Sequence, residues 1–132
     1  MIGETVTIIL PLPPRVLSPN CPPGSRGGRM AKAAASKKYR KLACDAAKAE
    51  QVESGPWEKA TARAAFFHKQ RRRRDDVNHL AMLKAAYDGV VQAGLLADDD
   101  SEHLKTLTPT FAIDRKFDRV ELTFTREGEE RI

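Results

Sequence analysis

The chain has 132 residues, of which 41% are hydrophobic and 31% charged, and its net charge is +5. A chain of this length is expected to form a single domain, residues 1–132, around one core. It has no apolar run that could cross a bilayer and no recognisable secretory signal, so we expect a cytoplasmic protein with reduced cysteines and no membrane contact. The excess of basic residues points to a polyanionic partner.

The N-terminal half predicts a strand, a loop, a helix and a second strand. Residues 5–10 (TVTIIL) are rich in β-branched side chains and end at a proline-rich segment that cannot continue a central strand. Residues 11–29 hold many of the prolines and glycines and predict a loop. The alanine- and lysine-rich residues 30–52 predict a helix, which Ser-Gly-Pro at 54–56 ends, and residues 60–68 predict a strand.

The C-terminal half predicts one helix and two strands. The apolar residues between 76 and 93 recur at helical spacing and predict a helix, and Gly94 is suited to follow its last turn. Residues 103–113 and 119–126 alternate as two strands around a hairpin-like connection. The resulting order, β-α-β-α-β-β, predicts an α/β fold of the α+β type, in which two helices pack on a small mixed β-sheet.

Lys84 has an unusual position in the second predicted helix. On a helical wheel it falls inside the apolar arc, between Val77 and Val91, with Asp88 at the edge of that arc. One interpretation is a lysine that pairs with Asp88, four residues on, and covers apolar surface with its stem. The other is an ammonium group directed at a phosphate or a carboxylate cluster near the helix start. The sequence favours neither.

Two groups of aspartates flank the same helix, namely Asp75 and Asp76 before it and Asp98, Asp99 and Asp100 after it. The helix separates its ends by about 25 Å, so the groups meet only if the chain turns back after Gly94 or if a symmetry-related copy supplies one of them. The first group is also a common N-cap, and the second a common solvated turn. If they meet, their oxygen atoms suit Mg²⁺, which would polarise a phosphate and generate hydroxide.

Two basic clusters are suited to bind a nucleic-acid backbone, largely without regard to its sequence. They are Lys37, Lys38, Arg40 and Lys41 in the first predicted helix, and Arg71, Arg72, Arg73 and Arg74 directly before the second. Because the arginines run straight into aspartates, we interpret them as bringing a phosphate to a metal that the acids hold. The three histidines, His68, His79 and His103, have no metal-ligand spacing with one another or with the cysteines.

These motifs, in this order, resemble the RusA-type Holliday junction resolvases that are common in phages and prophages. The stretches that carry the resemblance are LPLPP (10–14), KKYRKLA (37–43), RRRRDDVN (71–78) and KAAYDGVVQAGLLADDD (84–100). The last is the most specific, because several kinds of residue recur at fixed spacing. The family implies a mixed α/β homodimer that uses Mg²⁺ to cut four-way DNA junctions by paired symmetric nicks. We expect that Mn²⁺ can take the place of Mg²⁺.

The resemblance assigns the first acids by position. Asp75 matches the first acid of the family's Asp-x-Asp-Asn motif, and Asn78 matches its asparagine. Val77 stands where the family has the second acid, and the adjacent Asp76 would replace it. The stretch from Asn78 to Lys84 is also two residues longer than in the best-known members.

The remaining site residues follow in the same way. Asp99 matches the catalytic second acid of the family's Asp-Asp pair, Asp98 precedes it as a further metal ligand, and Lys84 matches the functional lysine. The resemblance therefore implies Asp75, Asp76, Asp99 and Lys84 as catalytic residues and Asp75, Asp76, Asp98 and Asp99 as metal ligands.

Three hypotheses follow from these residues. The first is a Mg²⁺-dependent, structure-selective DNA endonuclease that resolves four-way junctions in recombination and repair. The second is a junction-binding protein whose catalysis is weakened by Val77. The third is a basic RNA-binding or ribosome-associated domain, which ranks well below the others because the spacing of the acids would then be coincidental.

Overall fold

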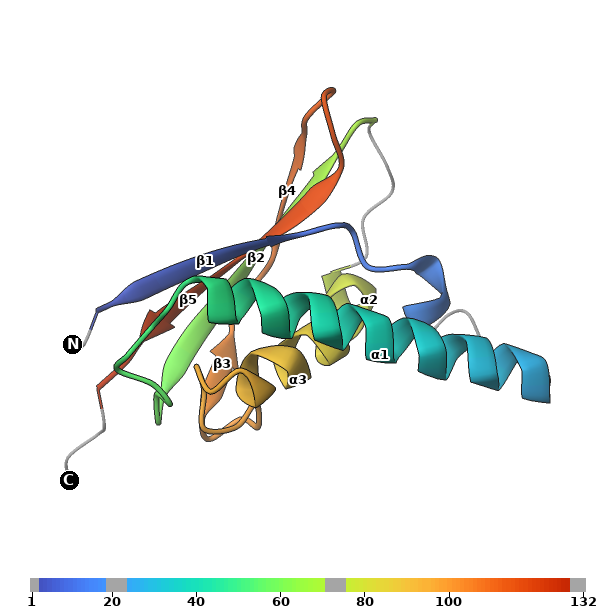
Figure 1. Cartoon of the computed structure of the whole chain (residues 1–132). Coiled ribbons are helices and arrows are strands. Elements are labelled where there is room, and N and C mark those ends of the chain that lie inside the picture. The colour runs from blue at the N-terminus through green and yellow to red at the C-terminus, as the bar shows by residue number, and fades with distance from the viewer. Residues whose placement is uncertain (1–2, 19–23, 71–75, 129–132) are drawn as a thin grey trace.

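The fold combines one five-stranded sheet with helices, in a computed structural model that describes residues 3–18, 24–70 and 76–128 (Figure 1). The elements in chain order are β1 (Thr5–Leu10), the 3-10 helix η1 (Arg15–Leu17), α1 (Arg26–Ala49), β2 (Ala60–His68), α2 (Asp76–Ala81), α3 (Lys84–Gln92), β3 (Leu104–Thr106), β4 (Thr110–Ile113) and β5 (Arg119–Arg126). This confirms the predicted α+β class. Among the described residues, no helix is long and apolar enough to cross a membrane.

The sheet is mixed, as predicted. Strand β5 pairs antiparallel with β1 on one side and with β2 on the other. Strands β3 and β4 both pair with β2 in parallel orientation. Burial alternates along β1, β2 and β5, so one face of the sheet is buried and the other is largely exposed. In Figure 1, α1 and α3 lie side by side against the sheet, and α1 extends well beyond it at its N-terminal end.

The core lies between the buried sheet face and these two helices. Its largest fully buried side chains are Ile8, Tyr39, Trp57, Phe66, Leu83, Val90, Leu96, Val120, Leu122 and Phe124. The close approach of α1 and α3 depends on Gly89. A Cβ atom at this position would collide with the carbonyl oxygen of Arg40 and lie 3.0 Å from the amide nitrogen of Cys44. The absence of a side chain therefore sets how α3, and with it Lys84, is placed against α1.

The first helix begins earlier than its predicted start at residue 30. Ser25 caps α1, because its hydroxyl oxygen accepts a hydrogen bond of 3.0 Å from the amide of Gly28. The prediction of a loop was therefore wrong for residues 26–29, where two glycines hid a helical turn.

Two other predicted elements are each divided in the structure. The helix expected over residues 76–93 breaks at Met82 and Leu83, although neither residue is a glycine or a proline. The strand expected over residues 103–113 is interrupted before β4 by the buried Pro109. Proline has no backbone N–H to donate to a ladder, so the pairing with β2 stops there and resumes in a new register. The predicted order β-α-β-α-β-β is wrong in these two places.

Candidate functional site

The acidic segment 98–100 lies beside the start of α3, because the chain turns back after that helix. Gly94 has a φ of 89°, a conformation that glycine adopts without strain. The next two residues, Leu95 and Leu96, are buried in the core. Two backbone hydrogen bonds then fix the returning segment to Trp57. The amide of Trp57 donates to the carbonyl oxygen of Leu95 at 2.7 Å, and the amide of Ala97 donates to the carbonyl oxygen of Trp57 at 2.9 Å.

Lys84 joins the returning segment to the helix. Its Nζ donates to Oδ1 of Asp88 at 2.8 Å and to Oδ2 of Asp99 at 2.5 Å. The Lys84 side chain is 66% exposed, whereas that of Asp99 is only 11% exposed. Both interpretations of Lys84 thus describe part of its environment, since it pairs with Asp88 and also points at a carboxylate of the acidic segment. Its side chain is exposed although it falls inside the apolar arc of the wheel, so the buried face of α3 does not extend to Lys84.

The charges at this contact stabilise each other. Partial burial alone would raise the pKa of the Asp99 carboxyl group. The hydrogen bond and charge of Lys84, together with hydrogen bonds involving Asp88 and Asp98, more than offset this and hold that pKa below its ordinary value of 3.8. Hydrogen bonds to Asp88 and Asp99 raise the pKa of the Lys84 ammonium group to about 12. Asp99 is therefore an anion and Lys84 a cation throughout the neutral range.

A second group of polar side chains lies in the same segment. Ligand atoms of Asp98, Asp100 and His103 all lie within 4.8 Å of one another, close enough to bind one metal ion. Asp100 also organises the turn, because its Oδ1 accepts hydrogen bonds from the amides of Glu102 at 3.0 Å and His103 at 3.1 Å. In the same way, Oδ1 of Asp98 accepts from the amide of Asp99 at 2.7 Å.

His103 lies between two acids. Its Nδ1 is 2.6 Å from Oδ1 of Asp100, and its Nε2 is 3.3 Å from Oε1 of Glu58. The hydrogen bond to Asp100 raises the pKa of the imidazole, and the same contact lowers the pKa of the Asp100 carboxyl group. A metal ion at this position would have to displace that proton.

Sequence reasoning missed Asp100 and His103 as a pair of candidate ligands. It compared the histidines only with one another and with the cysteines. The signal was present as Asp-x-Asp-x-x-His over residues 98–103, a spacing at which one tight turn brings the side chains together.

Several predicted site residues lie outside the described residues. These are Asp75 and the arginines Arg71, Arg72, Arg73 and Arg74. Asp76 is the first residue of α2, but its side chain and those of Val77 and Asn78 lie outside the described part of the chain. The predicted meeting of Asp75 and Asp76 with Asp99 therefore stays a prediction.

The first basic cluster lies along α1. Lys37, Lys38 and Lys41 are exposed, and Arg40 is half-buried. Lys41 pairs with Asp45, one turn on, at 3.0 Å. Surface pairs of this kind contribute little to stability, so the ammonium group can exchange its partner for a phosphate at small cost.

Comparison with known proteins adds no assignment. No family model matches the sequence, and no curated protein matches it significantly.

Proposed function

We propose that this chain is a metal-dependent, structure-selective DNA endonuclease that cuts four-way junctions during recombination and repair. The observation that carries the proposal is the contact between Lys84 and Asp99. A solvated turn after a helix has no need to return to the lysine at the helix start. The resemblance to RusA-type resolvases requires a functional lysine and a catalytic acid at these two positions, and the fold brings them into contact.

The available donors fit a divalent metal. Asp98 and Asp100 offer carboxylate oxygens, which suit Mg²⁺ and Mn²⁺, and His103 offers a nitrogen, which Mn²⁺ accepts more readily than Mg²⁺. Asp75, Asp76 and Asp99 are the further candidate ligands that the resemblance implies. A bound metal would polarise the scissile phosphate and lower the pKa of its water.

The protein's own residues would position the substrate. Lys84 fixes the orientation of the Asp99 carboxylate and leaves most of its own surface open to an approaching phosphate. The exposed lysines of α1, together with Arg71 to Arg74, would hold the DNA backbone by charge. Two symmetric nicks need two symmetric sites, so the proposal includes a homodimer.

The test is cleavage of a labelled, fixed-core four-way junction with Mg²⁺ or Mn²⁺. We expect paired nicks from the wild type, and from Asp99→Asn we expect binding with cleavage reduced at least about 100-fold, the size of effect that follows loss of a metal-binding or charge-stabilising group. Asp45→Asn is the matched control, because Asp45 is an exposed acid paired with a lysine away from the site. The nuclease proposal fails if the wild type leaves the junction intact with both metals. If Asp99→Asn cuts as well as Asp45→Asn, the role proposed for Asp99 fails.

A second candidate function has its own support in Val77, which stands where the resemblance expects an acid. A site with one carboxylate fewer would bind metal more weakly and could leave a junction-binding protein without turnover. Such a protein binds the junction in the same assay but produces no nicks with either metal. Restoring the acid with Val77→Asp would then be expected to produce cleavage.

A further inference from the structure

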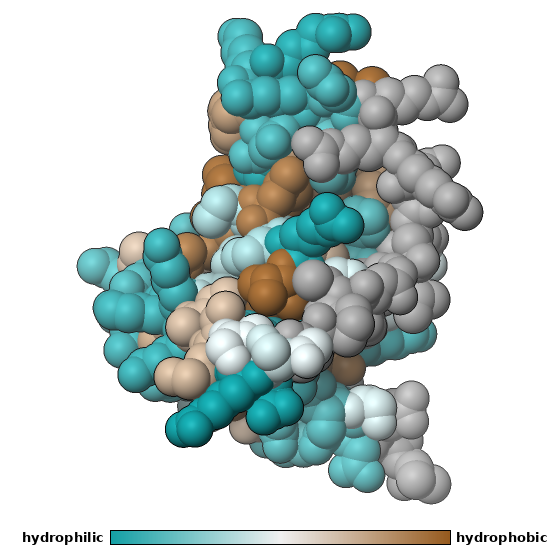
Figure 2. Space-filling model, turned by 90° about the vertical axis from the view of Figure 1, so that its right-hand side faces the viewer, coloured by the Kyte–Doolittle hydropathy of each residue, from teal (hydrophilic) through white to brown (hydrophobic). Residues whose placement is uncertain are grey.

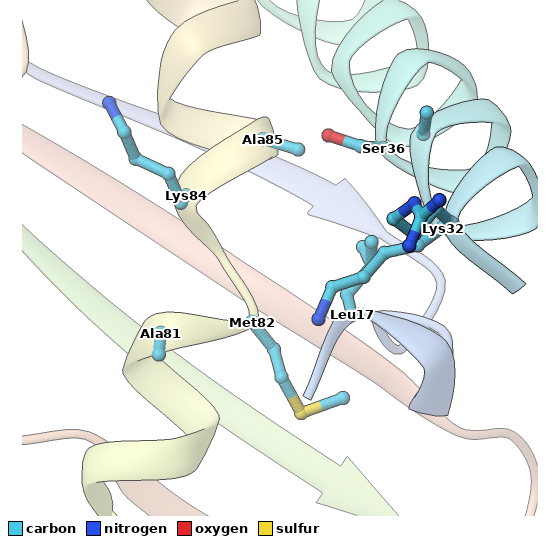
Figure 3. A pocket seen from close by; sticks show the side chains of 9 residues that line it. Leu17, Lys32, Ser36, Ala81, Met82, Lys84 and Ala85 are labelled. Carbon is cyan, nitrogen blue, oxygen red and sulfur yellow. The ribbon is translucent and has the colours of Figure 1, made fainter. Parts of the chain in front are cut away.

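A cavity of about 350 Å³ opens between the N-terminal half of α1, η1 and the break between α2 and α3 (Figure 3). Its size lies within the range for sites that hold one small organic molecule or one nucleotide. Because α1 extends beyond the sheet (Figure 1), its N-terminal half is free to line this cavity with Arg29, Lys32, Ala33 and Ser36. Figure 2 shows this side of the molecule, where a small apolar area lies among hydrophilic side chains.

The polar groups of the cavity favour an anion. Arg29, Lys32 and Ser36 follow one another at helical spacing on the face of α1 that lines it. None of the described residues that line the cavity is acidic. Within the described part of the chain, neither Arg29 nor Lys32 has an ion-pair partner, and the Nζ of Lys32 makes only a long contact of 3.5 Å with the carbonyl oxygen of Ser18.

The rest of the lining is apolar. Leu17 and Met82 are half-buried and both line the cavity (Figure 3), together with Ala33, Ala81 and Ala85 from the three α-helices. A bare phosphate would leave this surface unused. A phosphate joined to a flat, largely apolar ring system would use both parts, and a nucleotide has this composition.

The cavity adjoins the candidate catalytic site through Lys84. The stem of Lys84 lines one end of the cavity, while its ammonium group points away from Lys32 and Met82 (Figure 3) and bonds to Asp99. A strand whose phosphate contacts Arg29 and Lys32 would therefore continue past the Lys84–Asp99 pair.

We infer that this cavity binds one nucleotide of a DNA strand, with its phosphate on Arg29 and Lys32 and its unstacked base against Leu17 and Met82. The identity of the ligand as DNA rests on the proposed function. The binding itself requires no metal and no cleavage. An unstacked base is available in single strands and is least costly to extrude where pairing is interrupted, so the cavity would favour DNA with unpaired nucleotides.

The experiment measures binding in EDTA, by fluorescence anisotropy, with a labelled single-stranded oligothymidine and with an abasic phosphodiester of the same length. We expect Arg29→Ala combined with Lys32→Ala to weaken oligothymidine binding about tenfold at moderate salt, and to reduce the slope of log affinity against log salt by about 0.7, for the one phosphate that both residues contact. The control is Lys48→Ala combined with Arg63→Ala, which removes the same charge from exposed positions elsewhere.

Met82→Ala tests the base contact. It is expected to weaken binding of oligothymidine severalfold and to leave binding of the abasic strand unchanged. Thermal unfolding of each variant checks that the fold is retained, as expected for residues outside the core.

The outcomes separate the cavity from the proposed function. Equal loss of affinity in the Arg29/Lys32 and Lys48/Arg63 variants overturns the cavity assignment, even if the wild type cuts junctions. Selective loss in the first variant supports it, even if no cleavage is ever seen. Tighter binding of thymidine 5′-monophosphate than of the oligonucleotide would assign the cavity to a free nucleotide and overturn the DNA strand as its ligand.

Discussion

Lys84 links two segments that are 15 residues apart in the chain, the start of α3 and the acidic segment that follows it. The pair differs from an ordinary surface ion pair because one partner is largely enclosed. Asp99, with 11% of its side chain exposed, has lost much of its contact with water. Its charge is tolerated because Lys84 supplies a hydrogen bond and an opposite charge.

Replacement of Lys84 by methionine should therefore reduce stability. The variant keeps the stem but leaves Asp99 without its cation, and we expect the free energy of unfolding to fall by about 1–2 kcal/mol, less than for a fully buried pair because Lys84 itself is exposed. Urea unfolding at neutral pH measures the difference. Lys41→Met is the matched control, since Lys41 makes an equivalent pair with Asp45 in which both side chains are exposed. It should cost less than about 0.5 kcal/mol.

The same comparison has a defined pH dependence. The pKa of Asp99 is lowered in the folded protein, so its contribution to stability is fully present above the unfolded pKa of about 4 and is lost as the pH falls through the lower folded value. The difference between wild type and Lys84→Met should be constant from about pH 5 to 9 and shrink below about pH 4. A difference that stays unchanged at pH 3 would show that Lys84 acts through packing instead of charge.

At the scale of elements, local patterns predicted much of the fold. The strands 5–10, 60–68 and 119–126 have the predicted bounds, because each alternates between a buried and an exposed face and ends at a turn. The break at Met82 and Leu83 had no such signal. The break is stabilised by tertiary packing, which buries Leu83 completely while Lys84 faces water. No local helix propensity predicts where such a break occurs.

The sequence predicted which residues belong to the candidate site, but not how the fold brings them together. The sequence identified Lys84 and Asp99 through a resemblance to a family, but the turn that brings them together depends on Leu95 and Leu96 packing beside Trp57. That contact is between segments about 40 residues apart in the chain, which periodicity within one segment does not reveal. His103 was missed because the histidines were compared only with one another and with the cysteines, whereas the partners of His103 are carboxylates.

Gly89 provides a test of how α3 is placed. Substitution by alanine would normally favour a helix, but here the added Cβ would collide with the carbonyl oxygen of Arg40 on α1. We expect Gly89→Ala to lower the free energy of unfolding by about 2–3 kcal/mol, because the two helices must separate. The loss should be visible in urea unfolding and should also reduce any junction cleavage, since α3 carries Lys84.

The control for this prediction is Gly27→Ala in the first turn of α1. A Cβ at Gly27 would meet only the Ser25 hydroxyl, at 3.9 Å, so the substitution has room. It should be neutral or stabilise the protein by up to about 1 kcal/mol, the ordinary gain of alanine over glycine in a helix. Similar effects at both positions would mean that the α1–α3 contact is not close-packed.

At the scale of the whole molecule, the candidate site and the cavity lie on the helical side of the sheet, at the α2–α3 junction and the end of α1. The opposite face of the sheet carries the exposed side chains of β1, β2 and β5 and is not covered by any helix of the described residues. One chain therefore presents one candidate site. Paired nicks in two strands of a junction would need a second copy of the chain, related by symmetry.

Mixing active and inactive chains tests that requirement. On a supercoiled plasmid with an extruded cruciform, a homodimer that nicks both strands in one encounter converts the plasmid to a linear product, whereas a dimer with one Asp99→Asn subunit makes one nick and leaves an open circle. After subunit exchange at equal concentrations, about half of the dimers would be mixed, so the ratio of open-circular to linear product should rise well above that of the wild type alone. If the chain acts as a monomer, adding Asp99→Asn slows the reaction by competition for the junction but leaves that ratio unchanged, and the homodimer part of the proposal fails while the nuclease part stands.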